Sequence, residues 1–232
     1  NPNPYDSEPY YNLGLALFYQ GKMEKAFDAF YKATWSNEQQ EMSFYYLAAI
    51  ESGRGHYEAA LEFVNKGLVK NVHNIKARGL KAVILRKLGK QEEAKRQIEE
   101  NLKVDPFDFV SMFENALLEK DSPDALAEMN KRMRNFGESY LQAARDYAES
   151  GNYEEAVAIL AQCTEEKPML YYYKGYYLHC MGSTTEAKAV YETAETCSPL
   201  YCFPNKLEDI AVLKDAIAAC SDGAKAYYYL GN

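Results

Sequence analysis

The sequence lacks the features that mark membrane proteins and proteins that bind nucleic acids. No apolar run approaches the roughly 18 residues that a membrane-spanning helix needs, and the 232 residues carry a formal net charge of −8. Affinity for phosphate backbones depends on clustered Lys and Arg side chains, which an acidic chain has in short supply. We therefore expect neither nucleic acid nor, in this segment, a membrane among the partners.

A signal peptide is also missing from the visible chain. The opening NPNPYDSEP has neither the basic nor the apolar part of such a segment. The cytoplasm is therefore the favoured location, although a signal peptide upstream of this segment stays compatible with the sequence.

Cysteine is scarce and shows no pattern typical of a metal site. The five cysteines are odd in number and contain no C-x-x-C pair, so we interpret them as small apolar residues in helix interfaces. The alternative is a metal site, but no two of its candidate ligands have a recognised spacing. These candidates are His179, Cys180, Cys197 and Cys202. We expect no metal ion and no cofactor.

Catalytic motifs are absent as well. The sequence contains no glycine-rich phosphate loop, no nucleophile elbow and no H-E-x-x-H segment, and its three histidines are scattered. Acidic pairs such as Glu92-Glu93 and Glu154-Glu155 fall at predicted helix ends, where they serve the helix dipole or solubility. The segment is therefore predicted to be non-catalytic, and the activity of the full-length protein stays open.

What the sequence does contain is a repeat with a period of 34 residues. Two residue types recur at this spacing in register, one series of glycines and one of alanines. The series are Gly21, Gly55 and Gly89, and Ala26, Ala60 and Ala94. Because two independent residue types follow the same period, we interpret the repeat as a property of the fold.

Each period predicts a pair of antiparallel helices. Two apolar stripes at helical spacing are separated by a glycine-containing turn, such as YQGKME or KLGKQE. Small residues recur where two helix backbones would approach closely, for example Gly14, Ala48 and Ala82. A larger side chain at these places would force the helices of a pair apart.

The repeat resembles the tetratricopeptide repeat. The first period reads Tyr10-x-x-Leu13-Gly14, followed by Ala26-x-x-x-Phe30. The family's unit carries W-x-x-L-G-x-x-Y, then A-x-x-x-F, then a late proline. The resemblance implies an all-α fold, a right-handed superhelical solenoid of antiparallel helix pairs, and a role in binding other proteins.

The whole chain, residues 1–232, is predicted to be one solenoid of such repeats. The predicted repeats span residues 7–40, 41–74, 75–108, 109–136, 137–167 and 168–200, and the fourth is degenerate. Residues 201–222 follow as a loop with a lone amphipathic helix, and residues 223–232 begin a truncated next repeat. The closing AYYYLGN is similar to PYYNLGLAL near the start, so we interpret the chain as a piece of a longer array.

A second, weaker resemblance concerns the larger protein to which such a piece would belong. The phrases DSEPYYNLGLALFYQGKMEKA and FPNKLEDIAVLKDAIAACSDGAKAYYYLGN look like the repeat region of large bacterial proteins that carry a mutarotase-like, β-rich domain ahead of their repeats. This resemblance implies an alternative function, a structural or substrate-positioning arm of a larger bacterial carbohydrate-active protein.

Stacked helix pairs present the first helix of each pair on a concave inner face, and helical spacing from the small residues predicts which side chains line it. Tyr and Phe recur there, and tyrosine combines rigid contact area with a hydroxyl group, which suits a peptide ligand. The alternative is that most of these tyrosines fill helix interfaces. The predicted partner-binding residues are Tyr11, Leu15, Phe18, Tyr45, Lys76, Val83, Arg86, Phe113, Leu117, Arg145, Tyr172, Tyr176 and His179, and Leu141 shares their face.

Charge adds a second feature to this face. Residues 75–90 contain six basic residues and no acidic one. Lys76 and Arg86 share the inner face by helical spacing and are predicted to hold a carboxylate or an acidic peptide, unless the run is simply a solvated face. The sequence thus predicts a non-catalytic scaffold that binds a peptide, or a neighbouring domain, in an aromatic and partly basic groove.

Overall fold

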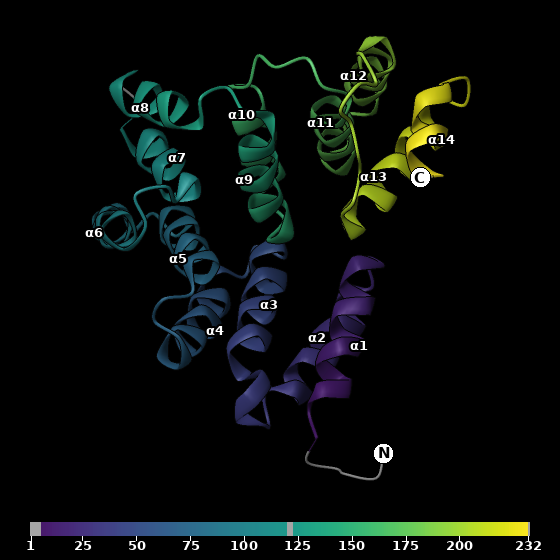
Figure 1. Cartoon of the computed structure of the whole chain (residues 1–232). Coiled ribbons are helices and arrows are strands. Elements are labelled where there is room, and N and C mark those ends of the chain that lie inside the picture. The colour runs from purple at the N-terminus through teal and green to yellow at the C-terminus, as the bar shows by residue number, and fades with distance from the viewer. Residues whose placement is uncertain (1–5, 120–122, 232) are drawn as a thin grey trace. The chain divides into compact units, whose positions relative to one another are not determined.

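The computed structural model describes residues 6–119 and 123–231, and these residues form α-helices and one short 3-10 helix but no strand (Figure 1). The predicted all-α fold is therefore confirmed. The chain divides into two compact units. The first unit holds residues up to 132 together with 149–151, and the second unit holds residues 133–148 and 152–232.

The helices follow one another with short connections. In the first part of the chain they are α1 (Glu8–Tyr19), α2 (Met23–Ala33), η1 (Asn37–Gln39), α3 (Gln40–Gly53), α4 (Tyr57–Lys70), α5 (Ile75–Lys87), α6 (Gln91–Val104), α7 (Phe109–Leu118) and α8 (Pro123–Met133). They continue with α9 (Gly137–Glu149), α10 (Tyr153–Leu160), α11 (Pro168–Cys180), α12 (Thr184–Thr196), α13 (Leu207–Ala219) and α14 (Ala224–Leu230). Sequential helices pack as pairs, for example α1 with α2, α3 with α4, and α11 with α12.

The turns inside the pairs depend on glycine. Gly21 and Gly55 follow the first helices of two pairs with φ angles of 72° and 77°. This left-handed conformation reverses the chain direction after a helix, and glycine adopts it without the steric penalty of a Cβ atom. The glycine turns that the sequence predicts are therefore present.

Small residues lie where the helices of a pair approach most closely. A Cβ atom on Gly14 would lie 2.7 Å from the ring of Phe30, and one on Gly175 would lie 2.4 Å from the ring of Tyr191. Ala26, on the helix that faces α1, is fully buried. The aromatic rings thus occupy the space that the missing side chains leave.

Aromatic side chains also fill the core of the first unit. The rings of Phe30 and Tyr46 stack with centroids 4.7 Å apart, and Phe18 meets Tyr46 edge-on at 5.2 Å. Stacked and edge-on pairs of this kind add to the free energy gained from apolar burial. Because these rings come from three helices, they hold the first two helix pairs together.

In the second unit, tyrosine hydroxyl groups join the helices by bonds to carboxylates. Tyr173 of α11 donates to Asp209 of α13 at 2.6 Å, and Tyr191 of α12 donates to Asp215 of α13 at 2.5 Å. The helix expected to be a lone one, α13, packs against α11 and α14.

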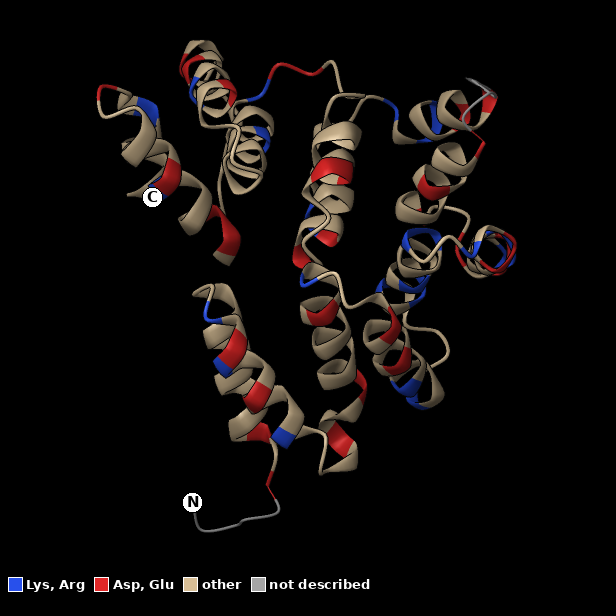
Figure 2. Ribbon diagram, turned by 180° about the vertical axis from the view of Figure 1, so that it is seen from behind, with Lys and Arg blue, Asp and Glu red and all other residues tan. Residues whose placement is uncertain are grey.

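Charge is unevenly distributed among the helices. α5 carries five basic residues and no acidic one, whereas α2 and α6, for example, carry residues of both signs (Figure 2). Within the described residues, no helix has the length and apolar composition needed to cross a membrane.

Candidate functional site

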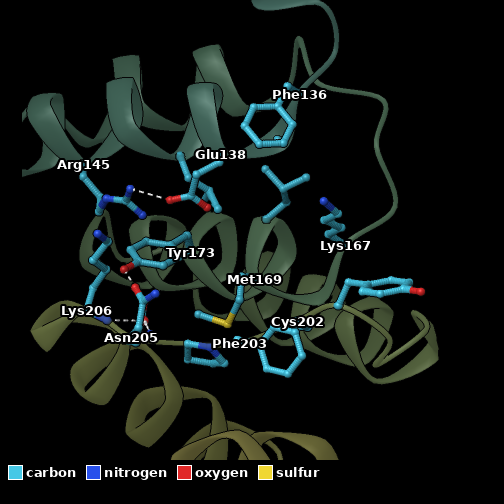
Figure 3. A pocket seen from close by; sticks show the side chains of 16 residues that line it. Phe136, Glu138, Arg145, Lys167, Met169, Tyr173, Cys202, Phe203, Asn205 and Lys206 are labelled. Atoms are coloured by element: carbon cyan, nitrogen blue, oxygen red, sulfur yellow. Dashed lines mark hydrogen bonds and ion pairs between the residues drawn. The ribbon is translucent and has the colours of Figure 1, made fainter.

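A pocket of about 430 Å³ lies in the second unit (Figure 3). Its lining comes from α9, α11, the connector 201–206 and the beginning of α13. Leu141 and Arg145, both predicted for the inner face, are part of this lining. The volume falls within the range of about 300–1,000 Å³ typical of ligand sites.

Local sequence features determine where α9 and α11 begin beside the pocket. α9 begins at Gly137, whose N–H donates to the Glu165 carboxylate at 2.7 Å, and a Cβ atom on Gly137 would lie 2.6 Å from the same carboxylate. α11 begins with Pro168, whose missing N–H leaves no unsatisfied donor at a helix start. These two starts bring the first turns of α9 and α11 to the pocket.

A buried polar network forms one wall of the pocket. Arg145 donates through Nη2 to Glu138 at 2.9 Å and to Gln142 at 3.1 Å, and its guanidinium lies 5.7 Å from the centre of the Tyr173 ring. The Tyr173 hydroxyl in turn donates to Asp209. Burial, with the Asp209 carboxylate beside it, raises the pKa of Tyr173, so this hydroxyl stays a neutral donor.

Asp209 ties the connector to this network. Its Oδ2 atom accepts the backbone N–H groups of Asn205 and Lys206, each at 2.8 Å, while Oδ1 accepts the Tyr173 hydroxyl. A carboxylate that accepts N–H groups at a helix start stabilises that helix. Asp209 therefore positions both the start of α13 and the connector that covers the pocket.

Three aromatic side chains of the pocket lining are largely exposed. Phe136 is 55% exposed, Phe203 79% and Tyr201 84%. Tyr201 adopts a φ angle of 58°, which turns the connector sharply beside the pocket. The pocket lining thus includes three large rings that are mostly exposed, and exposed apolar surface of this kind often marks interaction sites.

Sequence reasoning missed most of this pocket. Helical spacing identified Leu141 and Arg145, but it assigned LYCFPN only to a loop and gave no place to Phe136 or Phe203. The aromatic content of LYCFPN was the available signal, since exposed loops seldom carry so many large apolar residues.

The predicted partner-binding residues of the first unit differ in accessibility. Those that are buried lie between packed helices, which agrees with the alternative that such side chains fill helix interfaces. They are Phe18, Tyr45, Val83 and Phe113. The half-buried ones are Tyr11, Leu15, Lys76, Arg86 and Leu117.

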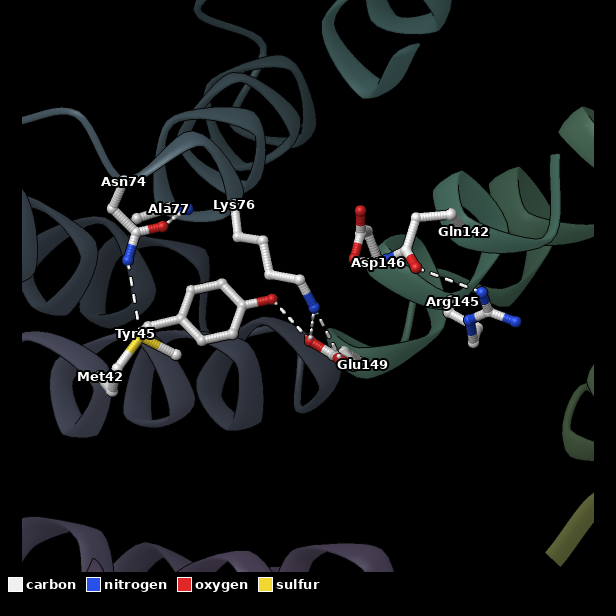
Figure 4. Close-up of polar contacts among 9 residues, drawn as sticks. All are labelled: Met42, Tyr45, Asn74, Lys76, Ala77, Gln142, Arg145, Asp146 and Glu149. Carbon is white, nitrogen blue, oxygen red and sulfur yellow. Dashed lines mark hydrogen bonds and ion pairs between the residues drawn. The ribbon is translucent and has the colours of Figure 1, made fainter. Parts of the chain in front are cut away.

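Lys76 already has a carboxylate partner in the first unit. Its Nζ atom lies 3.1 and 3.3 Å from the two oxygens of Glu149, and Tyr45 donates its hydroxyl to the same carboxylate at 2.7 Å (Figure 4). The Glu149 side chain is buried. An acidic ligand at Lys76 would therefore have to compete with Glu149.

Arg86 is paired in a similar way. It donates through Nε and Nη2 to Glu114 of α7 at 2.6 and 3.0 Å, a two-bond geometry that is typical of strong Arg–carboxylate pairs. Glu114 is fully buried. This pair joins α5 to α7, so both cations assigned to an acidic partner have a carboxylate neighbour within the fold.

In the second unit, three predicted residues lie outside the pocket lining. Tyr172 is buried and donates its hydroxyl to Glu195 at 2.6 Å. Tyr176 is half-buried, and His179 is exposed with its Nδ1 atom 2.6 Å from Asp215 of α13. Among the described residues no group of three or more His, Cys, Asp or Glu side chains is arranged to hold a metal ion.

Comparison with known proteins identifies the repeats. Residues 7–40, 75–108 and 137–168 match the family model of the tetratricopeptide repeat. Together with the helix pairs described above, these matches show that the chain is a tetratricopeptide repeat protein. A search of curated protein sequences found no significant match.

The solved structures that are similar to this chain include two tetratricopeptide repeat proteins. A tetratricopeptide repeat protein from Parabacteroides merdae ATCC 43184 is 20% identical with a TM-score of 0.53, and the match covers 95% of this chain and 86% of that protein. YrrB, described as a tetratricopeptide repeat protein with an unusual peptide-binding site, is 18% identical with a TM-score of 0.51. That match covers 78% of this chain and 94% of YrrB. At this level of identity the similarities show the fold.

The fold defines the general function. Tetratricopeptide repeats form helical solenoids that act in protein–protein interaction, and the fold is generally non-catalytic. The chain is therefore a protein-interaction scaffold of this class.

Proposed function

We propose that the second unit binds an extended peptide segment, from a partner protein or from a neighbouring domain of the same protein, in the pocket between α9, α11 and the connector 201–206. The observation that carries this proposal is that Leu141 and Arg145, from the predicted inner face of a first helix, line a pocket of about 430 Å³. A ligand site of this kind is concave and mostly apolar, with a few fixed polar groups.

The chemistry of the lining supports a peptide ligand. Met169 and Leu170 supply apolar surface, while Arg145 and Tyr173 form a fixed polar wall. A peptide presents both kinds of group, because its backbone is polar and its side chains alternate in an extended conformation. The description of YrrB as having a peptide-binding site supports the same class of ligand, since YrrB shares the fold.

We extend the proposal to the remaining residues of the predicted face. Tyr11, Leu15 and Leu117 keep part of their side chains accessible on first helices. They are proposed to contact a ligand or domain that is too long for the pocket alone. Lys76 and Arg86 would contribute there only by exchanging their internal carboxylates for those of the ligand.

We propose that such a long ligand or domain also contacts two inner-face residues of the second unit that lie outside the pocket, Tyr176 and His179.

The alternative function, an arm of a larger bacterial carbohydrate-active protein, stays a prediction.

Selection of peptides from a random display library tests the proposal. Binding of the selected peptides would be measured by fluorescence anisotropy with the parent chain and with the double variant Phe136→Ser/Phe203→Ser. Because both rings are exposed, the variant should fold normally, which circular dichroism checks. We expect affinity to fall about tenfold or more, as when interface aromatics are removed.

A matched control is available in the same unit. Tyr227 and Tyr228 are 52% and 61% exposed and lie outside the pocket lining. The variant Tyr227→Ser/Tyr228→Ser should bind the selected peptides with the parent affinity. Equal affinity of the parent and the Phe136→Ser/Phe203→Ser variant would overturn the proposal.

A further inference from the structure

Aromatic side chains make up much of the lining of the pocket in the second unit. They are Phe136, Tyr173, Tyr201 and Phe203. Tyr173 is buried and is held by the bond from its hydroxyl to Asp209, whereas the other three are largely exposed. Aromatic pairs in offset or edge-on geometry add free energy beyond that of apolar contact. A ring that enters the pocket can therefore gain more from this lining than an aliphatic side chain does.

Two buried residues supply aliphatic surface to the same lining, Met169 and Leu170. The unbranched side chain of Met adapts its shape to an inserted group, and its thioether makes favourable contacts with aromatic rings. This part of the lining therefore tolerates a large side chain and also favours a ring.

Two cations of the lining already lie beside ring faces. The Arg145 guanidinium is 5.7 Å from the centre of the Tyr173 ring, and the Lys167 amino group is 5.7 Å from the centre of the Phe136 ring. In Figure 3, Arg145 lies on the side of Tyr173 and Lys167 on the side of Phe136. The Lys167 amino group also lies 2.8 Å from the Glu165 carboxylate.

Lys167 decides between a ring and an aliphatic side chain. It is half-buried, so an apolar group that enters the pocket covers part of it and removes water from its ammonium group. An aliphatic side chain offers no compensation for this loss, whereas the electron-rich face of a ring attracts a cation. Arg145 is buried and bonded to Glu138 and Gln142, so its environment changes little.

We infer that the bound segment inserts an aromatic side chain, Phe, Tyr or Trp, into this pocket and that Lys167 selects it over an aliphatic side chain. This inference rests on the proposed function and specifies the residue that the segment must carry. A segment whose apolar residues are all aliphatic would lack the contact between the cation and a ring.

Alanine scanning of the display-selected peptides identifies the inserted residue. Its replacement by Ala should weaken binding to the parent chain but have little further effect on binding to Phe136→Ser/Phe203→Ser, because the effects of contacting residues are not additive. We expect the residue identified in this way to be aromatic.

Two synthetic peptides test the role of Lys167. They differ only at the inserted position, which holds Phe in one and pentafluorophenylalanine in the other, because fluorination withdraws electrons from the ring face but keeps a flat ring. The ratio of their dissociation constants measures the preference for an electron-rich ring. We expect this preference to fall about twofold to fivefold in Lys167→Gln, the range of an exposed contact between a cation and a ring.

Two further variants are the controls. Lys167→Arg keeps a cation and should retain the preference of the parent chain. Lys214→Gln changes an exposed residue of α13 outside the pocket lining and should also bind both peptides as the parent does. Circular dichroism checks that each variant is folded.

Two results would overturn the inference. One is an aliphatic inserted residue in most of the selected peptides, and the other is an unchanged ratio in Lys167→Gln. If these peptides still lose affinity for Phe136→Ser/Phe203→Ser, the proposed function survives and only the ligand assignment fails. Peptides that bind the parent and Phe136→Ser/Phe203→Ser equally would overturn the proposed function, and the inference with it.

Discussion

Gly175 shows how a single residue sets the distance between two helices. The Tyr191 ring lies where a side chain at this position would be, 2.4 Å from an added Cβ atom. Tyr191 is itself fixed, because it is buried and its hydroxyl donates to Asp215. The ring therefore has little freedom to move away from α11.

We predict that Gly175→Ala destabilises the protein by about 1–3 kcal/mol, as expected for overpacking of a filled core. This reverses the usual result, since Ala is favoured over Gly in a helix by about 1 kcal/mol. Gly53→Ala is the control, because its nearest heavy atom lies at an ordinary contact distance of 3.6 Å. Urea unfolding measures both, and a Gly175→Ala variant as stable as the parent would contradict the packing described.

Residue spacing predicted these small residues but not the ion pairs. The position of Gly14 or Ala26 follows from a local period, since both helices of a pair are close in sequence. Lys76 and Glu149 are 73 positions apart, and no local pattern links them. Helical spacing assigns a residue to a face, but which distant side chain meets it depends on tertiary packing.

At the scale of helices, a buried carboxylate caps the start of α7. Asp108 precedes α7, is buried, and accepts the Ser111 N–H at 3.1 Å and the Ser111 hydroxyl at 2.6 Å. Burial raises the pKa of Asp108 above its ordinary value of 3.8, and the bonds from Ser111 only partly oppose this.

This shift predicts a pH dependence of stability. The folded state holds the Asp108 proton more tightly than the unfolded state does. The contribution of Asp108 to the free energy of unfolding therefore falls as pH rises from 3.8 through the raised pKa. Asparagine caps a helix about as well as aspartate but does not ionise. We therefore expect Asp108→Asn to gain stability relative to the parent as pH rises from 3.8 toward neutrality.

Urea unfolding at a series of pH values measures this difference. Asp124→Asn, at an exposed position in the first turn of α8, serves as the control and should follow the pH profile of the parent. Parallel profiles for the parent and Asp108→Asn would show that the buried carboxylate has no such effect.

Helices were more predictable than connectors at this scale. Apolar stripes and glycine turns are local and periodic, so helix pairs follow from them. The connector 201–206 carries no period, and its place over the pocket depends on the bonds from Asn205 and Lys206 to Asp209. Those bonds form only after α11 and α13 have packed.

For the molecule as a whole, the 21 tyrosines influence stability as well as recognition. Burial is the largest cause that raises the pKa of Tyr172, Tyr173, Tyr177 and Tyr191 in the second unit. It also raises the pKa of Tyr176 to about 12 from the ordinary value of 10.0. A phenol whose pKa is raised in the folded state makes its full contribution to stability at pH values below the pKa that it has in the unfolded chain. This contribution is lost as pH rises through the pKa of the folded state.

We predict that the free energy of unfolding falls between pH 10 and pH 12, because the unfolded chain releases its phenolic protons first. Tyr176→Phe should make the fall shallower, since one of the shifted groups is removed. Tyr201→Phe, at an exposed position, should leave the slope unchanged. Identical slopes for the parent and Tyr176→Phe would contradict this prediction.

The sequence also predicted the class of the whole molecule, because the repeat motif is carried by many residues at once. It did not predict the division into two units, since the repeat pattern treats successive pairs as equivalent. The boundaries of the individual repeats remain predictions of the sequence.

The central claim is that the pocket of the second unit is the peptide site, and chemical-shift mapping tests it most directly. A display-selected peptide would be titrated into the isotope-labelled chain and the backbone amide shifts recorded. We predict the largest changes at Phe136, Leu141 and Phe203, around the pocket. Changes concentrated at Tyr11 and Leu15 of the first unit, with none at the pocket, would contradict the account.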